Sequence, residues 1–277
     1  DRIDIVVKAL HFNTRFLKDL LARIEANARP EEMVPKEIVF NEEEIDQMNR
    51  EILAVDFPVE LRRRFEFFAG HFELFESGGE QLEYKTKDNV KLSGVDFRRI
   101  AGLETGKDQY KDIGSQTRNG LSVRALMTSL VFTKALTYFR GEAEVSFDDM
   151  RNILPFVLHD KLVQNPDSPF FEKQENQVYR VDKIGWLRKL FDLSCAEYDR
   201  LDLDRKDPVR EVEEIFEKGL VDVTEQETRR QMVKIERILE QWSKDRKLYG
   251  HVFDDILKLK YLHQRYTNYL KWLQWKK

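Results

Sequence analysis

Apolar residues recur every three or four positions through much of the first half of the chain. Spacing of i, i+3, i+4 and i+7 places such residues on one face of a helix, which can then pack against a core. The predicted helical stripes are Phe16, Leu17, Leu20, Leu21 and Ile24; Ile45, Met48, Ile52 and Leu53; Leu61, Phe65, Phe68 and Phe72; Val123, Leu126, Met127, Leu130 and Val131; and Met150, Ile153, Leu154, Val157 and Leu158.

The second half of the chain continues the same pattern. Beyond residue 180 every segment predicts helix, and the last one, after Gly250, is rich in Leu, Tyr and Trp. No fixed-period repeat is present. The stripes here are Trp186, Leu187, Leu190 and Phe191; Val212, Ile215 and Phe216; and Met232, Ile235, Ile238, Leu239 and Trp242.

Short polar residues stand where several of these helices begin. A side-chain oxygen at the N-cap accepts a hydrogen bond from the first turn, and an acidic residue three positions later can return one. Glycine just past a helix end adopts the left-handed backbone readily. Pro155 predicts a kink or a break within its helix. The predicted caps are Asn41 with Glu44, Ser146 with Asp149, Asp207 before Pro208, Thr224 with Glu227, and Gly141 at a C-terminus.

A few segments depart from the helical pattern. Residues 3–7 predict a short strand, and residues 81–86 and 90–93 predict a small hairpin around Lys87-Asp88-Asn89. Residues 101–114 are polar and punctuated by glycine. Residues 165–180, which begin Asn-Pro-Asp-Ser-Pro, are the best candidate for a linker.

Composition narrows the class of protein. Of 277 residues 41% are hydrophobic and 35% are charged, which suits a folded core with long solvated helices. The formal net charge of −4 implies neither nucleic acid nor a membrane as the main partner. The single cysteine, Cys195, fits a reducing compartment, so we expect a cytoplasmic protein. No apolar run is long enough to span a bilayer. Because the first residue is Asp, we expect the chain to be part of a longer protein.

Residue spacing argues against a phosphate-binding loop and against a metal site. The stretch Gly102 to Lys107 superficially suggests a phosphate loop, but only three residues separate its glycines and Asp108 follows the lysine. The five histidines are scattered and Cys195 has no cysteine partner, so no metal site is predicted. For the stretch from Gly102 to Lys107, a surface loop is the better interpretation.

The informative segment is Gly120-Leu-Ser-Val-Arg124-Ala-Leu. It resembles the Gly-x-Ser-x-Arg-Ala-Leu stretch that opens a lid helix in MoxR-like AAA+ ATPases. The resemblance continues through Phe139-Arg-Gly141, residues 145–151, and residues 154–162, where Lys161 stands in place of a usual arginine. Asp1-Arg2-Ile3 resembles the tail of the family's core. Together these matches cover about residues 1–75 and 115–163.

The resemblance implies an AAA+ lid bundle, and the residue pattern adds an inserted β-hairpin and a C-terminal helical extension, so we expect a mainly α-helical fold. Residues 1–10 would be the remnant of the nucleotide-binding core, ending in its last strand. Residues 11–164 would form the lid, with the insertion at 77–117. Residues 170–277 would form an extension of about four helices whose role the family does not supply.

The resemblance also implies activity and site residues. The parent protein would bind ATP with Mg²⁺ and hydrolyse it in a ring, expected to be a hexamer, for chaperone-like remodelling, often beside a von Willebrand A domain protein. Arg124 would be sensor 2, with Gly120, Ser122 and Arg118 near the nucleotide. Arg2 is a candidate arginine finger for a neighbouring subunit. Since the phosphate loop and the acidic catalytic residues are absent, the chain alone should not hydrolyse ATP.

The residues themselves leave alternatives open. An arginine in a helix first turn gains from a nearby phosphate, but it can equally form a local surface ion pair. A non-enzymatic helical scaffold or adaptor is the alternative function. The end of the chain, with Trp272 and Trp275 among lysines, can meet nucleic acid or a membrane surface, but we expect it to pack on the preceding helices.

Overall fold

The structure is a computed structural model that describes residues 3–7, 14–27, 29, 34–72, 113–245 and 250–276. Across these ranges the chain is mainly α-helical, which confirms that part of the prediction, and it contains no β-strand. Two isolated β-bridges join Asp56 to Glu144 and Thr117 to Gln164. The predicted hairpin at 81–93 and the stretch from Gly102 to Lys107 lie outside the described residues.

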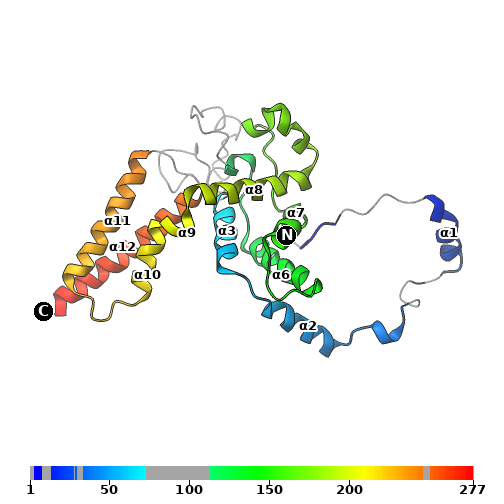
Figure 1. Ribbon diagram of the computed structural model, residues 1–277, viewed down its shortest axis with the longest axis horizontal. Helices are drawn as coiled ribbons and strands as arrows, with labels where there is room; N and C mark the ends of the chain where they lie inside the picture. Colours follow the sequence, from blue (N-terminus) through cyan, green and yellow to red (C-terminus); the bar gives the residue numbers. More distant parts are fainter. Residues whose placement is uncertain are drawn as a thin grey trace.

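Figure 1 shows the arrangement of the helices. The α-helices are α1 (Leu17–Glu25), α2 (Glu42–Ala54), α3 (Val59–Gly70), α6 (Val123–Phe139), α7 (Phe147–Leu158), α8 (Lys183–Leu201), α9 (Leu203–Lys206), α10 (Pro208–Glu217), α11 (Glu225–Asp245) and α12 (Gly250–Lys276). Short 3₁₀ helices are η1 (Thr14–Phe16), η3 (Lys36–Ile38), η5 (Ile113–Gln116), η6 (Pro169–Glu172) and η7 (Gln174–Arg180).

The predicted helix boundaries rest on real caps. Asn41 and Ser146 each form a capping box with the acidic residue three positions later. Asp207 accepts hydrogen bonds from the first turn of α10, which starts at Pro208. Gly141 has a φ of +74°, and the amide of Glu142 donates back to the Thr137 carbonyl, as in a Schellman motif. Of the kink or break predicted at Pro155, the break is wrong, because α7 runs through this residue.

A first hydrophobic core joins α3, α7 and α8. Its most enclosed side chains include Phe68, Met150, Leu158, Trp186 and Phe191, each fully buried. The stripes predicted for these helices are therefore confirmed in their main members.

Residues 165–180, predicted as a linker, fold instead as η6 and η7. Phe170 and Phe171 of η6 insert into the first core, and Asn176 is buried and donates to the Phe170 carbonyl. The first core therefore continues past residue 164 and includes α8. The segment begins with turn-forming residues, which favoured a linker, but burial of Phe170 and Phe171 places it on the first core.

The buried face of α6 differs from the predicted stripe. Val123, Met127 and Val131 are exposed, whereas Ala125, Ser129, Thr133 and Thr137 are buried. The hydroxyls of Ser129 and Thr133 donate to the carbonyl one turn earlier, and the Thr137 hydroxyl shares its one proton between the Thr133 carbonyl and Asp149, so burying them costs little. Small side chains at every fourth position let α7 pack closely on this face.

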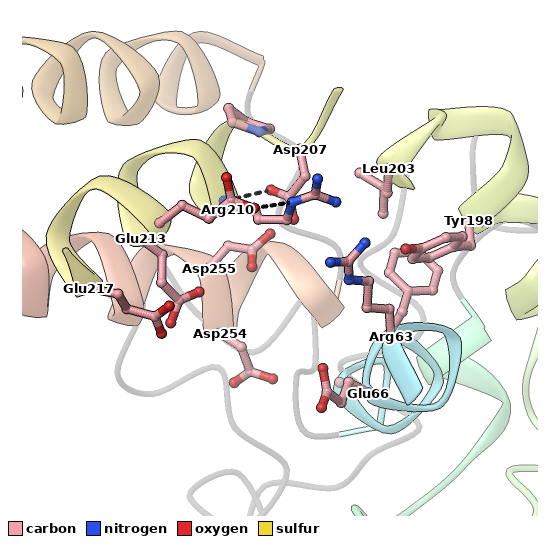
Figure 2. Close-up of a pocket in the computed structure, with 14 residues that line it drawn as sticks. Arg63, Glu66, Tyr198, Leu203, Asp207, Arg210, Glu213, Glu217, Asp254 and Asp255 are labelled. Atoms are coloured by element: carbon pink, nitrogen blue, oxygen red, sulfur yellow. Dashed lines mark hydrogen bonds and ion pairs between the residues drawn. The ribbon is translucent and has the colours of Figure 1, made fainter. Parts of the chain in front are cut away.

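A second core lies among α10, α11 and α12. Val212, Ile235, Leu259 and Tyr266 are buried in it, and the predicted stripe of α11 packs around them. The helix α12 also contacts α3, so the extension is attached to the first core. At this attachment α3, α9, α10 and α12 surround a cavity of about 470 Å³ (Figure 2).

The end of α12 does not pack as expected. Trp275 is 85% exposed and Trp272 is 45% exposed, so the predicted packing against earlier helices is wrong for Trp275. Trp272 stacks on Tyr269, and Lys276 lies over its ring. Among the described helices, none combines the length and the apolar character that a membrane span needs.

The N-terminal elements lie largely outside the cores. The apolar stripes of α1 and α2 are mostly exposed, and neither helix contains a buried residue. Residues 3–7 are extended but do not form the predicted strand, because no strand in the described ranges lies beside them. Instead the Val6 amide donates to the Phe156 carbonyl of α7 at 3.0 Å.

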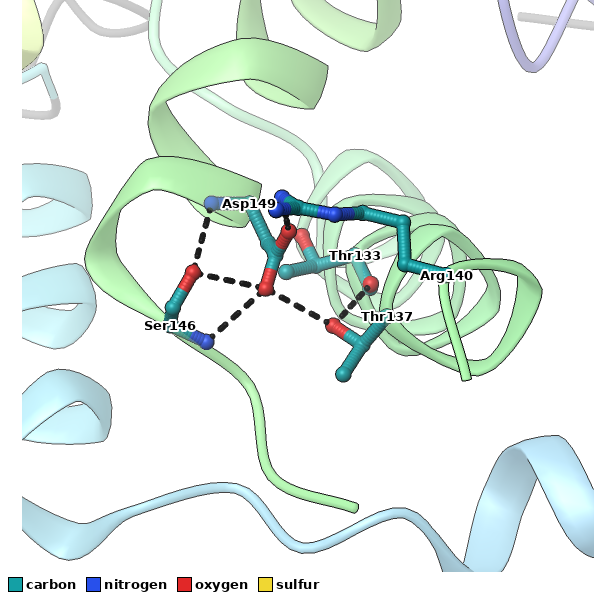
Figure 3. A network of polar contacts seen from close by, with 5 residues as sticks. All are labelled: Thr133, Thr137, Arg140, Ser146 and Asp149. Atoms are coloured by element: carbon teal, nitrogen blue, oxygen red, sulfur yellow. Dashed lines mark hydrogen bonds and ion pairs between the residues drawn. The ribbon is translucent and has the colours of Figure 1, made fainter. Parts of the chain in front are cut away.

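A buried carboxylate fixes the turn between α6 and α7. Asp149 is 1% exposed and accepts from the amide and hydroxyl of Ser146, from Thr137 and, at 2.5 Å, from Arg140 (Figure 3). Burial by itself raises the pKa of Asp149. The bonds from Ser146 and Thr137 and the charge of Arg140 outweigh it and lower the pKa below its usual 3.8.

We predict that Asp149→Ala destabilises the chain by about 2–4 kcal/mol, because four donors lose their acceptor. The half-exposed position of Arg140 limits the cost, since its charge is not left fully buried. Thermal unfolding at neutral pH measures the change. Since the pKa of Asp149 is lowered by folding, its contribution is present above pH 3.8 and is lost as pH falls through the lowered value.

The control for this variant is Asp148→Ala, which removes an exposed carboxylate from the same helix turn. We expect it to cost at most about 1 kcal/mol, the value of a favourable helix-dipole contact. Equal losses for the two variants would contradict the role given to Asp149.

Candidate functional site

The N-terminus of α6 contains four of the five residues that the sequence singled out. Ser122 is its N-cap and accepts from the Ala125 amide at 3.2 Å. Gly120 lies just before it, and Arg124 lies in the first turn with an exposed side chain. Arg2, the candidate arginine finger, lies outside the described residues.

Residues 117–119 run beside the segment that follows α7. The Arg118 amide donates to the Val163 carbonyl at 2.9 Å, and the Asn119 side chain bonds both the Val163 amide and the Lys161 carbonyl. The guanidinium of Arg118 lies 3.5 Å from Asp167, while its Nε is buried without a hydrogen-bond partner. This pairing holds the N-terminus of α6 against the C-terminal end of α7.

Residues 3–7 lie against the same place. The Lys161 ammonium donates to the carbonyls of Ile3 and Asp4 at 2.7 and 3.0 Å. The Thr128 hydroxyl donates to Asp4 at 3.3 Å, and Ile5 packs against the first core. Sequence reasoning noted Lys161 only as a departure from a family pattern and missed Thr128 and Asp4, which no local pattern connects.

Arg124 and Thr128 share one face of α6, because residues four apart in a helix lie above one another. Thr128 meets Asp4, so Arg124 stands one turn away on the face that receives residues 3–7. The structure thus brings Arg118, Gly120, Ser122 and Arg124 to one end of the α6–α7 pair. That end combines two guanidinium groups with the N-terminus of a helix, which suits an anion.

The polar groups at this end of the α6–α7 pair suit an anion such as a phosphate group. The buried, unpartnered Nε of Arg118 is a donor that an anionic oxygen would satisfy, so a phosphate fits. Among the described residues there is no cluster of three or more His, Cys, Asp or Glu side chains suited to a metal.

The cavity between α3, α9, α10 and α12 is a second candidate, and its character is acidic. Figure 2 shows carboxylates from several helices converging on it, with Arg63 and Arg210 among them. Arg210 pairs with Glu214, and Lys258 pairs with Glu213. The carboxylates that line the cavity are Glu66, Asp207, Glu213, Glu214, Glu217, Asp254 and Asp255.

Burial, together with the crowding of like charges, raises the pKa values of carboxyls in this cavity. Burial, and then the neighbouring charges of Asp207, Asp254 and Glu213, raise the pKa of Asp255 to about 7. Burial also raises the pKa of Asp254 and of Glu66. Burial of these carboxylates and the repulsion between them destabilise the fold, and the packing of α12 on α3 and α10 must offset both effects.

We predict that Asp255→Asn stabilises the chain at pH 8 by about 1–2 kcal/mol, less than the full electrostatic effect because the side chain is partly solvated. A carboxyl whose pKa is raised by folding stabilises the fold fully below its unfolded value of 3.8 and loses that contribution as pH rises to about 7. The gain should therefore grow from nothing near pH 4 to its maximum above pH 7.

Chemical denaturation at several pH values measures this gain. Glu214→Gln is the control, since it removes the same charge from the same cavity but also breaks the ion pair with Arg210. We expect no gain from it. A pH-independent effect of Asp255→Asn would show that the repulsion assigned to Asp255 is absent.

One comparison with known proteins covers the residues of the first site. Residues 111–182 match a family model described as an AAA lid domain. This range contains Arg118, Gly120, Ser122, Arg124 and Lys161, and it ends just before α8. Searches of curated proteins and of solved structures found no match. The chain therefore contains a lid region similar to that of AAA ATPases.

Proposed function

We propose that this chain is the lid-bearing part of a MoxR-like AAA+ ATPase and that Arg124 is its sensor 2 residue. One observation carries the proposal. Arg124 is exposed in the first turn of α6, inside the range that matches an AAA lid domain, on the helix face that meets residues 3–7.

The chemistry of this position supports the role. A guanidinium presents a planar set of donors that matches phosphate oxygens and stays charged at all physiological pH values. Ser122 orders the first turn of α6, so the arginine projects from a fixed backbone. In ATP hydrolysis, positive groups stabilise the charge that spreads over the transferring phosphoryl group. Arg124 would supply such charge from the lid.

The other site residues take supporting roles in this proposal. Arg118, with its buried Nε, would face the same phosphates, while Gly120 and Ser122 shape the entry to α6. Arg2 would act on the nucleotide of a neighbouring subunit. ATP supplies the phosphoanhydride bond that is cleaved, and Mg²⁺ would be held by a nucleotide-binding core rather than by the described residues of this chain.

We further propose that the protein works in a ring, expected to be hexameric, in chaperone-like remodelling beside a von Willebrand A domain partner. Exposed apolar surface supports an assembly. Val123, Met127 and Val131 form an open stripe on α6, next to Arg124. A nucleotide-binding core or a neighbouring subunit that covers this stripe would bring its nucleotide to the arginine.

The second candidate function is a non-enzymatic helical scaffold. The observation that favours it is the exposed amphipathic face of α1, where Leu17, Leu20, Leu21 and Ile24 all lie open among the described residues. Such a face binds a partner helix without any nucleotide. The two candidates differ in what they require of Arg124.

We predict that Arg124→Ala, in a complete protein containing a nucleotide-binding core, lowers the rate of ATP hydrolysis by about a hundredfold, a loss typical of one charge-stabilising group. Its unfolding temperature should stay unchanged because the side chain is exposed. Arg124→Lys should recover the activity only in part, since an ammonium lacks the planar fork.

The matched control is Arg237→Ala, which removes an exposed arginine from α11 in the second core. We expect it to leave hydrolysis as it is. If Arg124→Ala hydrolyses ATP at the wild-type rate, sensor 2 lies elsewhere and the scaffold becomes the better account.

A further inference from the structure

We infer that Lys161 holds residues 3–7 against α6 and α7 and thereby positions Arg124. We call this contact of Lys161 with residues 3–7 the latch. The inference rests on the proposed function for its catalytic consequence, but the latch itself is a feature of this chain.

Three backbone carbonyls surround the Lys161 ammonium. Its Nζ lies 2.7 Å from the Ile3 oxygen, 3.0 Å from the Asp4 oxygen and 3.2 Å from the Val157 oxygen. An ammonium has three N–H donors and no acceptor, so all three find a partner here. Two of the acceptors belong to residues 3–7 and the third to α7, so a single nitrogen joins the two segments.

The end of α7 explains why this place binds an extended segment. The last carbonyls of a helix have no partner inside the helix and carry the negative end of its dipole. Here the Phe156 carbonyl accepts from the Val6 amide, and the Val157 carbonyl accepts from Lys161. Residues 3–7 and Lys161 together satisfy carbonyls that α7 leaves open.

A second contact fixes the same segment to α6. Asp4 accepts from Thr128, and Ile5 fills a place at the edge of the first core. Since Arg124 lies one turn before Thr128 on the same face, the path of residues 3–7 sets what can approach the guanidinium. With the latch closed, residues 3–7, α6 and α7 move as one body.

The geometry selects lysine over arginine. Acceptors grouped around one point suit the compact ammonium, whereas the donors of a guanidinium spread over a planar fork. The Asn119 side chain donates to the Lys161 carbonyl at 2.6 Å and holds the backbone of the latch in place. Lys161→Arg should therefore fail to restore the latch although it keeps the charge.

Hydrogen exchange of the chain tests the latch directly. We expect the Val6 amide to exchange about tenfold faster in Lys161→Met, and nearly as fast in Lys161→Arg, because the segment opens when charged hydrogen bonds are lost. Thr128→Val should speed the same amide from the α6 side. Amides in α8 should keep their protection, which shows that the variants stay folded.

The matched control is Lys134→Met. Lys134 also reaches from α6 to a backbone carbonyl, that of Leu53 at 2.7 Å, but it ties α2 rather than residues 3–7. We expect Val6 exchange to be unchanged in this variant. Unchanged Val6 exchange in Lys161→Met, or full protection in Lys161→Arg, overturns the latch.

The catalytic consequence is tested in the complete ATPase. Lys161→Met should lower kcat about tenfold while KM for ATP stays within about twofold, because Lys161 orients the lid without touching the nucleotide. An unchanged kcat, with Val6 exchange accelerated, overturns the positioning role of Lys161. The absence of ATP hydrolysis by the wild-type protein instead counts against the proposed function and leaves the latch standing on its exchange data.

Discussion

The buried carboxylate of Asp149 is the contact on which the rest of the lid depends. It joins the C-terminal end of α6 to the first turn of α7 through Arg140, Thr137 and Ser146. A fixed turn at this end makes the two helices an antiparallel pair. The N-terminus of α6 must then lie beside the C-terminus of α7, one helix length away from the carboxylate.

The charged and hydrogen-bonding groups of the candidate site lie at that far end. Arg124 projects from the start of α6, and the open carbonyls of α7 receive residues 3–7 and Lys161. The small, hydroxyl-bearing face of α6 turns toward α7, which leaves Val123 and Met127 on the outside. The packing that builds the first core thus also presents an arginine beside an apolar surface that a larger protein can cover.

The sequence predicted the features that depend on residues close together along the chain, such as helix caps. The caps at Asn41 and Ser146 followed from short polar side chains with an acid three positions later. The buried face of α6 did not follow, because hydrophobicity ranks threonine below methionine while i−4 hydrogen bonds let threonine be buried. The junction of Lys161 with Asp4 joins residues 157 positions apart, and only the fold reveals it.

The most direct measurement of the central claim is a structure, with a non-hydrolysable ATP analogue, of a complete protein that contains a nucleotide-binding core. The account predicts the Arg124 guanidinium at about 3 Å from a γ-phosphate oxygen, with residues 3–7 still seated on α6 and α7. A nucleotide bound on another face of the lid, with Arg124 directed into solvent, would contradict it.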